Sequence, residues 1–195
     1  IGNVYDHMHD FPKALEYFEK ALSFNERAGR KGHIAANLTS IGGIHYDLAD
    51  FPKALEFHQK ALIMYEQLGD ENGMATSFSN IGIAYQALAD FPRAFEYAQR
   101  SLAINRGIDD EYGQEVNLGN IGIWYSTAPD AVIRSMGIDP DRKYQLAETY
   151  LDSCMQLSKD LNMLDEEKKN WRHLSDLYEK QGDSAKAYAA YKKYI

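Results

Sequence analysis

The dipeptide Ile-Gly recurs every 40 residues, and this spacing constrains the fold more than any other feature of the chain. The pairs begin at Ile1, Ile41, Ile81 and Ile121. Nine residues after each of the first three pairs comes Asp-Phe-Pro, beginning at Asp10, Asp50 and Asp90. Because an aspartate can cap free backbone N–H groups and proline is tolerated in a first helical turn, each Asp-Phe-Pro predicts a helix start. Each unit is therefore expected to be two helices, a first (helix A) and a second (helix B).

Helix B of each unit has the apolar spacing of an amphipathic helix. In the first unit the apolar positions are Ala14, Leu15, Phe18, Ala21 and Leu22. Lysine and glutamate fill the positions between them, which predicts one buried and one solvated face. Glycine-containing stretches at 29–32, 69–73 and 107–113 are expected to end these helices and to turn the chain into the next unit.

The pattern resembles the tetratricopeptide repeat in a 40-residue form. The resemblance rests on Ile-Gly-x-x-Tyr at 81–85, on the Asp-Phe-Pro-x-Ala helix starts and on the small helix-B residues Ala14, Ala21, Ala54 and Ala61. The last unit has the fullest motif, with Trp171, Leu174, Tyr178, Gly182, Asp183, Ala187 and Tyr191. The chain departs from the pattern at His45, which stands in place of a tyrosine, and at His58 and Ala98, which stand where the first unit has Phe18.

The resemblance implies an all-α fold, a right-handed α-solenoid of about five helical hairpins whose neighbours share one continuous core. We expect a single domain over residues 1–195, with repeats at approximately 1–33, 34–73, 74–113, 114–163 and 164–195. The chain begins with Ile1 rather than Met and ends within a motif, so we expect it to be part of a longer protein.

The fourth unit contains an insert, placed at 126–142. Its helix B resumes at Ala147, an offset of 133 from Ala14 rather than 120. Two interpretations stay open at this point. The insert is either a tolerated surface loop, or its apolar residues fold over the groove or meet a partner.

Helix A of units two to four has a long uncharged stretch. Residues 34–46, 74–88 and 116–128 contain no Asp, Glu, Lys or Arg. Family resemblance places helix A on the inner surface of the solenoid. The side facing away from the core presents small, neutral or amide residues: Thr39, Gly43, Thr76, Asn80, Ile83, Gln86, Gly119, Asn120 and Ile123. These residues either pack against the neighbouring repeat or form a peptide groove, in which the asparagines bind the backbone of an extended segment and the isoleucines supply apolar contact.

Repeat domains of the chaperone-binding type hold a C-terminal carboxylate with Lys, Asn and Arg on helix A. Helix A of units two to four offers no base at the corresponding inner positions, so a carboxylate clamp is not expected. The final unit differs, because its helix A carries Lys169, Arg172, His173, Asp176, Glu179 and Lys180. We interpret these charges as the polar outer face that a terminal repeat needs.

No constellation of residues indicates catalysis, a metal site or a cofactor. His7 and His9 project to different faces and the stretch runs into a turn, which disfavours metal binding. His45 and His58 are interpreted as replacements of core aromatics. Cys154 takes the place of Ala21 on a helix B and is expected to be a buried, inert thiol. The stretch 109–111 lacks the alternating ligands of a calcium loop and is interpreted as a helix start or solvated turn.

The charge balance, 21 basic against 29 acidic residues for a net charge of −8, disfavours an electrostatic nucleic-acid binder. No apolar stretch has the roughly 20 residues that a membrane span needs. A lone cysteine cannot form an intramolecular disulfide, so the cytoplasm is the expected compartment.

The sequence therefore predicts a non-catalytic interaction module that binds a protein or peptide partner on helix A. The 40-residue repeats also resemble the sensory regions attached to bacterial adenylate and guanylate cyclases and histidine kinases, which implies a regulatory role in a signalling protein. The alternative is a self-association scaffold, a homodimer formed through the N-terminal face or the insert, that pairs attached domains.

Overall fold

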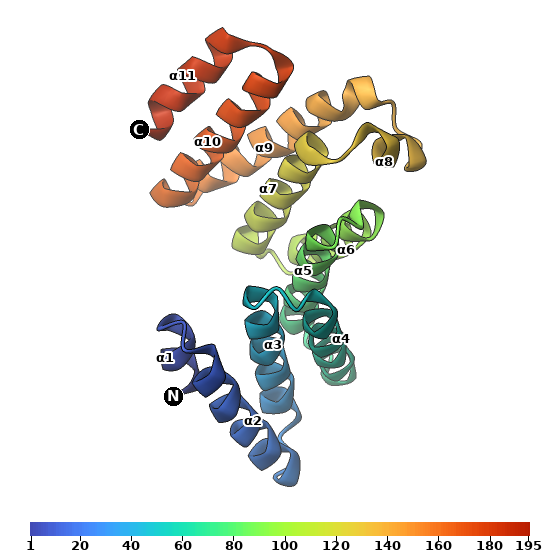
Figure 1. The fold of residues 1–195 in the computed structure, drawn as a ribbon, viewed down its shortest axis with the longest axis vertical. Coiled ribbons are helices and arrows are strands. Elements are labelled where there is room, and N and C mark those ends of the chain that lie inside the picture. The colour runs from blue at the N-terminus through green and yellow to red at the C-terminus, as the bar shows by residue number, and fades with distance from the viewer. The chain divides into compact units, whose positions relative to one another are not determined.

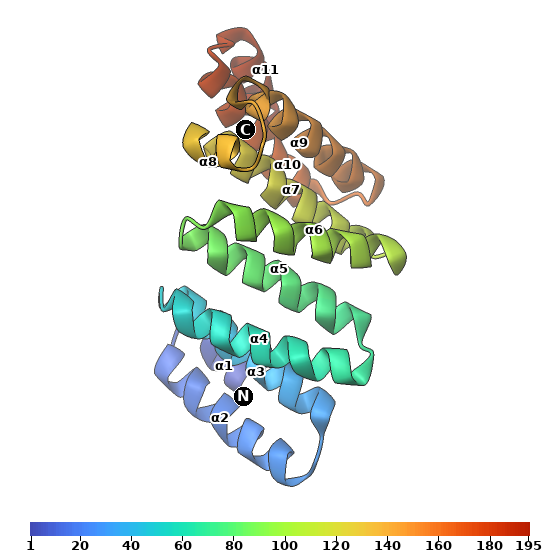
Figure 2. The same cartoon turned by 90° about the vertical axis from the view of Figure 1, so that its right-hand side faces the viewer.

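The computed structural model describes residues 1–195, which form eleven α-helices and one short 3₁₀-helix without any β-strand. Within each part of the chain, neighbouring helices pack on one another as hairpins, for example α3 with α4 and α10 with α11 (Figures 1 and 2). The contacts divide the chain into two compact units, Ile1–Ile104 and Asn105–Ile195, and each unit is described by itself. The expected all-α fold of about five helical hairpins is confirmed.

Unit 1 contains two full hairpins and most of a third. Its helices are α1 (Gly2–His7), α2 (Phe11–Arg27), α3 (Lys31–Asp47), α4 (Phe51–Leu68), α5 (Glu71–Ala87) and most of α6 (Phe91–Gly107). Helices α1, α3 and α5 are the helices A of the first three repeats, and α2, α4 and α6 are their helices B. Figure 2 shows α5 and α6 running alongside one another as one such pair.

The expected helix starts are confirmed at the atomic level. The carboxylates of Asp10, Asp50 and Asp90 accept hydrogen bonds from the backbone N–H three residues later, at 3.3, 3.4 and 3.3 Å. Proline follows in the first turn, where its missing N–H costs no intrahelical bond. The same device begins α5, where Asp70 accepts from the N–H of Gly73 at 3.0 Å.

The core of unit 1 lies between neighbouring helices, both within a hairpin and between one hairpin and the next. Ile41 and Ile44 of α3 pack with Ala14 and Phe18 of α2, and all four are at most 7% exposed. His45 takes the expected place of a core aromatic, since its ring stacks on Phe57 with centroids 5.4 Å apart. Each isoleucine buried in this way contributes about 1.5–3 kcal/mol to stability.

The turns between helices use left-handed backbone at regular positions. Gly29 and Gly69 end helices B with φ of 65° each. Ala49 and Ala89, 40 residues apart, have φ of 57° and 59° in the turn from helix A to helix B. Glycine adopts this conformation without a steric cost, whereas in alanine the β-carbon makes it unfavourable.

Unit 2 begins with the last residues of α6 and contains the fourth and fifth hairpins. Its elements are α7 (Glu111–Thr127), α8 (Asp130–Ser135), the 3₁₀-helix η1 (Pro140–Arg142), α9 (Lys143–Asp160), α10 (Leu164–Gln181) and α11 (Ser184–Tyr194). Asp110 caps α7 by accepting from the N–H of Gly113 at 3.0 Å, so the acidic stretch at 109–111 is a helix start. Helices α7 and α10 are the helices A of this unit.

The insert at 126–142 is an ordered part of unit 2. It carries α8 and η1, and Ile133 of α8 is fully buried. Lys143, at the start of α9, fastens the insert by an ion pair of 2.5 Å to Asp130 and by donating to the carbonyl of Ala128 at 3.4 Å. The insert thus has one fully buried apolar residue, and the contacts of Lys143 tie the segment to the start of α9.

Candidate functional site

Three of the predicted groove residues come together in unit 1. Gly43 of α3 and Asn80 and Ile83 of α5 line a cavity of about 180 Å³. The rest of the lining is Tyr46, Asp47 and His58. Two adjacent helices A therefore form one hollow, as the groove hypothesis requires, and His58 of helix B contributes to its wall.

The other predicted residues of unit 1 do not line this cavity. The hydroxyls of Thr39 and Thr76 donate to the carbonyls of Ala35 and Asn72, four residues back in their own helices, at 3.0 Å each. Thr76 is exposed, whereas Thr39 and Gln86 are half-buried. The threonine hydroxyls already have acceptors, so they offer less to a ligand than Asn80 does.

His58 is the least expected member of the cavity wall. Its side chain is 2% exposed, and its Nδ1 atom is buried without a hydrogen-bond partner. Burial lowers the pKa of the His58 imidazole to about 4, because the charged form loses its hydration. At neutral pH the ring is uncharged, so one ring nitrogen is an acceptor.

In unit 2 the remaining three predicted residues also come together. Gly119, Asn120 and Ile123 of α7 line a cavity of about 130 Å³. The lining also includes Glu115 and Val116 of α7, Cys154 of α9, and Glu166, Lys169, Asn170 and His173 of α10. Asn80 and Asn120 are 40 residues apart, as are Ile83 and Ile123, so each unit presents an asparagine and an isoleucine in the same register.

A buried carboxylate that the sequence analysis missed lies beside this second cavity. Glu115 is 3% exposed, and its Oε1 accepts from Ser158 Oγ at 2.8 Å and from Asn170 Nδ2 at 2.9 Å. Ala35 and Ala75 occupy the same register in the preceding repeats. Glu115 stands one residue before the uncharged stretch 116–128. The replacement of alanine by glutamate at this repeat position is the sequence feature that could have indicated a buried carboxylate.

Cys154 belongs to the same polar cluster. Its thiol lies 3.2 Å from Glu115 Oε1 and is 1% exposed. Burial and then the charge of Glu115 raise the pKa of the Cys154 thiol well above its usual range, so the thiol stays protonated at neutral pH. The expectation of a buried thiol is confirmed.

The two glycines predicted in the groove have different surroundings. A β-carbon on Gly43 would meet no atom within 4 Å, so this position is open. A β-carbon on Gly119 would lie 3.2 Å from Cys154 Sγ. The close packing of α9 therefore explains why a glycine stands at position 119. At Gly43 no neighbouring side chain lies close, so the surface of α3 is open there.

The final repeat's helix A contributes charge to the second cavity. Lys169, which pairs with Glu166 at 2.7 Å, and the half-buried His173 both line it. Burial lowers the pKa of the His173 imidazole. This part of the surface is thus more polar than the neutral helix A stretches suggest. No residue of the insert at 126–142 lines the cavity.

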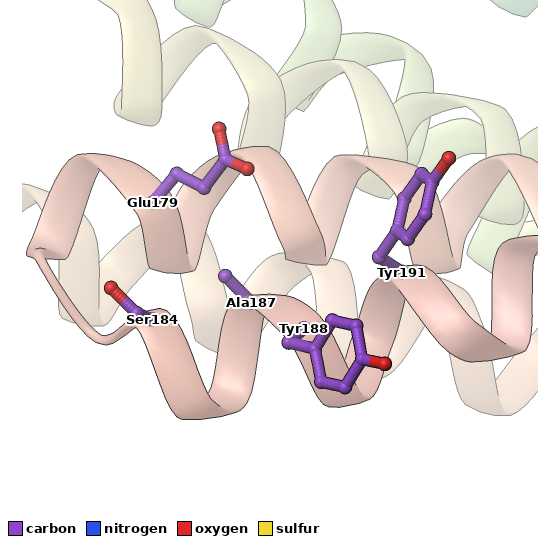
Figure 3. A pocket seen from close by; sticks show the side chains of 5 residues that line it. All are labelled: Glu179, Ser184, Ala187, Tyr188 and Tyr191. Atoms are coloured by element: carbon purple, nitrogen blue, oxygen red, sulfur yellow. The ribbon is translucent and has the colours of Figure 1, made fainter.

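A third hollow, of about 270 Å³, lies on the last hairpin. It is lined by Glu179 of α10 and by Ser184, Ala187, Tyr188 and Tyr191 of α11. Figure 3 shows the two tyrosine rings projecting from α11 in different directions, with Glu179 on the neighbouring helix. Tyr188 is 61% and Tyr191 47% exposed, which is unusual for such large side chains.

The structure contains no group of three or more His, Cys, Asp or Glu side chains placed to hold a metal ion. None of its helices combines the length and the apolar character needed to cross a membrane.

Comparison with protein families matches the tetratricopeptide repeat over residues 1–67 and 33–107, and again over residues 169–195. These segments together cover more than half of the chain. Comparison with curated proteins finds no match.

Solved structures of the same fold cover nearly the whole chain. One is BtubC (BKLC) from P. vanneervenii, with a TM-score of 0.81 and 20% identity over 99% of this chain and 75% of that one. Another is a putative kinesin light chain from Podosopora anserina with nearly identical TPR-like repeats, with a TM-score of 0.72 and 12% identity over 99% of this chain and 89% of that one. The apo form of RapI matches with a TM-score of 0.67 and 15% identity, over 100% of this chain and 64% of that one. At these identities the likeness concerns the fold.

Proposed function

Because the chain belongs to the tetratricopeptide repeat family, we propose that it is a non-catalytic protein–protein interaction module that binds a peptide segment of a partner on its helices A. One observation carries the proposal. In each unit, a helix A places an asparagine and an isoleucine of the same register, Asn80 with Ile83 and Asn120 with Ile123, in the wall of a cavity.

The chemistry of these walls suits a peptide backbone. An asparagine amide offers two donors and an acceptor, which match the C=O and N–H groups of an extended segment. The isoleucines add apolar contact, and the open space at Gly43 lets a backbone approach α3. The proposed contacts are Thr39, Gly43, Thr76, Asn80, Ile83, Gln86, Gly119, Asn120 and Ile123.

A carboxylate clamp fits the cavities less well. The unit 1 cavity has no lysine or arginine in its lining. In unit 2 the lining lysine, Lys169, is already paired with Glu166. A partner's C-terminal carboxylate would therefore meet either no base or one that is neutralised.

The wider role that we propose is regulatory. The module would be a sensory or regulatory part of a bacterial signalling protein, located in the cytoplasm, acting without a cofactor and without binding nucleic acid. The net charge of −8 supports the last point, because a phosphate backbone would be repelled.

Peptide selection on the 195-residue chain tests the binding surface. A displayed library of random peptides is selected on the purified chain, and the affinity of the enriched peptides is measured for the double variant Asn80→Arg/Asn120→Arg. We expect binding to be lost while the helical circular dichroism is unchanged. The matched control is Gln59→Arg/Gln99→Arg, which adds the same charge at exposed helix-B positions and should bind normally. Equal binding by both double variants would contradict the proposal that the peptide binds at Asn80 and Asn120.

Self-association is a second candidate function, favoured by exposed apolar side chains at both ends of the chain. Ile1, Val4 and Met8 are 78%, 59% and 68% exposed, and Tyr188 and Tyr191 surround the third hollow. Light scattering over a range of concentrations tests it. A molar mass that doubles with concentration, and that Tyr188→Ser/Tyr191→Ser returns to the monomer value, would favour a homodimer. A mass that stays monomeric would rule it out.

A further inference from the structure

The unit 1 cavity has an acidic rim without a basic counterpart. Asp47, the last residue of α3, lines the cavity and is exposed. Asp6 of α1 lies close enough to act on it electrostatically. Neither carboxylate forms an ion pair with a lysine or arginine of the chain.

Several effects make the potential at this rim negative. The negative charge of Asp6 acts on Asp47, since after partial burial it is the second cause that raises the pKa of the Asp47 carboxyl, and His9 counteracts it in part. The C-terminal end of α3, where Asp47 lies, carries the negative end of the helix dipole. A cation entering here would be attracted by both carboxylates and would relieve their mutual repulsion.

The lining of the cavity adds an amide acceptor and apolar surface. His58 closes the floor of the cavity with a side chain that is 2% exposed, and the edge of its ring that carries both nitrogens faces Gly42. The amide oxygen of Asn80 is an acceptor for N–H donors. Ile83 and the ring of Tyr46 offer apolar surface to a hydrocarbon stem.

We propose that this cavity is a subsite for one long basic side chain, lysine or arginine, of the bound peptide segment. The carboxylate of Asp47 pairs with the ammonium or guanidinium group, Asn80 accepts a further hydrogen bond, and Ile83 and Tyr46 cover the stem. The inference rests on the proposed peptide-binding function and names the chemistry that the partner must bring.

The test uses four acetylated and amidated pentapeptides that differ only in a central Arg, Lys, Gln or Glu between alanines. Each is titrated into the 195-residue chain, and nuclear magnetic resonance follows the His58 imidazole, the Gly43 amide and the Asn80 side-chain amide. Titration extends to about 10 mM, because a single side chain is expected to bind in the millimolar range. The Arg or Lys peptide should bind at least about fivefold more tightly than the Gln peptide, and the Glu peptide should not bind.

Two charge-matched variants separate a local subsite from general attraction. Asp47→Asn should abolish the preference for the basic peptides. Glu19→Gln removes the same charge from an exposed position on α2 and should leave the preference intact. A larger response to Arg than to Lys would assign the site to guanidinium, and the reverse to ammonium.

Three outcomes would overturn the proposal: equal weakening by both variants, equal binding of the Arg, Lys and Gln peptides, or no change in any of the three signals. Equal binding of Arg, Lys and Gln peptides would leave the peptide groove standing. The peptide-binding function of the groove is tested separately, by the library selection with the Asn80→Arg/Asn120→Arg variant.

Discussion

The imidazole of His58 lies directly against the α-carbon of Gly42: a β-carbon on Gly42 would come within 2.7 Å of the imidazole Cε1. The first and fourth repeats use the same arrangement, with Phe18 against Gly2 and Leu151 against Gly122. In these three Ile-Gly pairs the glycine therefore lets the helix-B side chain pack on the helix-A backbone.

This contact predicts opposite effects for two adjacent glycines. Gly42→Ala should destabilise the chain by about 1–2 kcal/mol, because the buried ring must shift and the better helix propensity of alanine offsets only part of the cost. Gly43→Ala, whose β-carbon would meet nothing within 4 Å, should stabilise it by about 0.5–1 kcal/mol. Urea unfolding measures both. The packing argument is wrong if the two variants shift the free energy of unfolding in the same direction.

His58 predicts a loss of stability in mild acid. Its pKa is about 4 in the folded chain against an ordinary value of 6.5, so between these values the unfolded chain binds a proton that the folded chain does not. The contribution of neutral His58 is complete above pH 6.5 and is lost as the pH falls towards 4, by about 3 kcal/mol in total. His58→Phe, which copies the Phe18 position, should flatten this part of the stability profile. A profile parallel to that of the parent chain would contradict the assignment.

The buried cluster around Glu115 predicts a graded response to substitution. Glu115→Ala should cost about 2–4 kcal/mol, because Ser158 and Asn170 lose a buried acceptor. Glu115→Gln keeps an acceptor oxygen and should cost about 1 kcal/mol. Glu111→Ala, at an exposed position in the first turn of the same helix, serves as the control and should stay within about 1 kcal/mol. Chemical unfolding that ranks Glu111→Ala as costly as Glu115→Ala would argue against the network.

The left-handed turn residues predict a stabilising substitution. Ala49 has φ of 57°, a conformation that costs an alanine about 1–2 kcal/mol and a glycine almost nothing. After the extra freedom of glycine in the unfolded chain is subtracted, Ala49→Gly should stabilise by about 0.5–1 kcal/mol. Ala103→Gly, within α6 at an exposed helical position, should instead destabilise by about 1 kcal/mol. Thermal unfolding of the two variants should move in opposite directions.

Much of the local structure follows from the sequence because its causes are local. The 40-residue period, the aspartate caps at Asp10, Asp50 and Asp90, and the spacing of Ala14 and Phe18 act within one or two helical turns or between neighbouring helices. These signals predicted the hairpins, their starts and the core positions, and also the replacement of core aromatics by His45 and His58. The candidate contacts Asn80 and Asn120 were found in the same way, from faces of single helices.

The tertiary structure decided which residues share a cavity. Glu115 of α7 meets Ser158 of α9 and Asn170 of α10, and Asp47 of α3 comes under the influence of Asp6 of α1, across separations that no local pattern encodes. The sequence does not show whether a charged residue beside an uncharged stretch is buried or exposed, because its burial depends on how the helices pack around it. Burial and the placement of acceptors then determine whether that charge is a structural partner, as for Glu115, or faces a cavity, as for Asp47. For this reason the neutrality of helix A could be predicted from the sequence, whereas the acidic rim and the buried polar cluster became visible only in the packed structure.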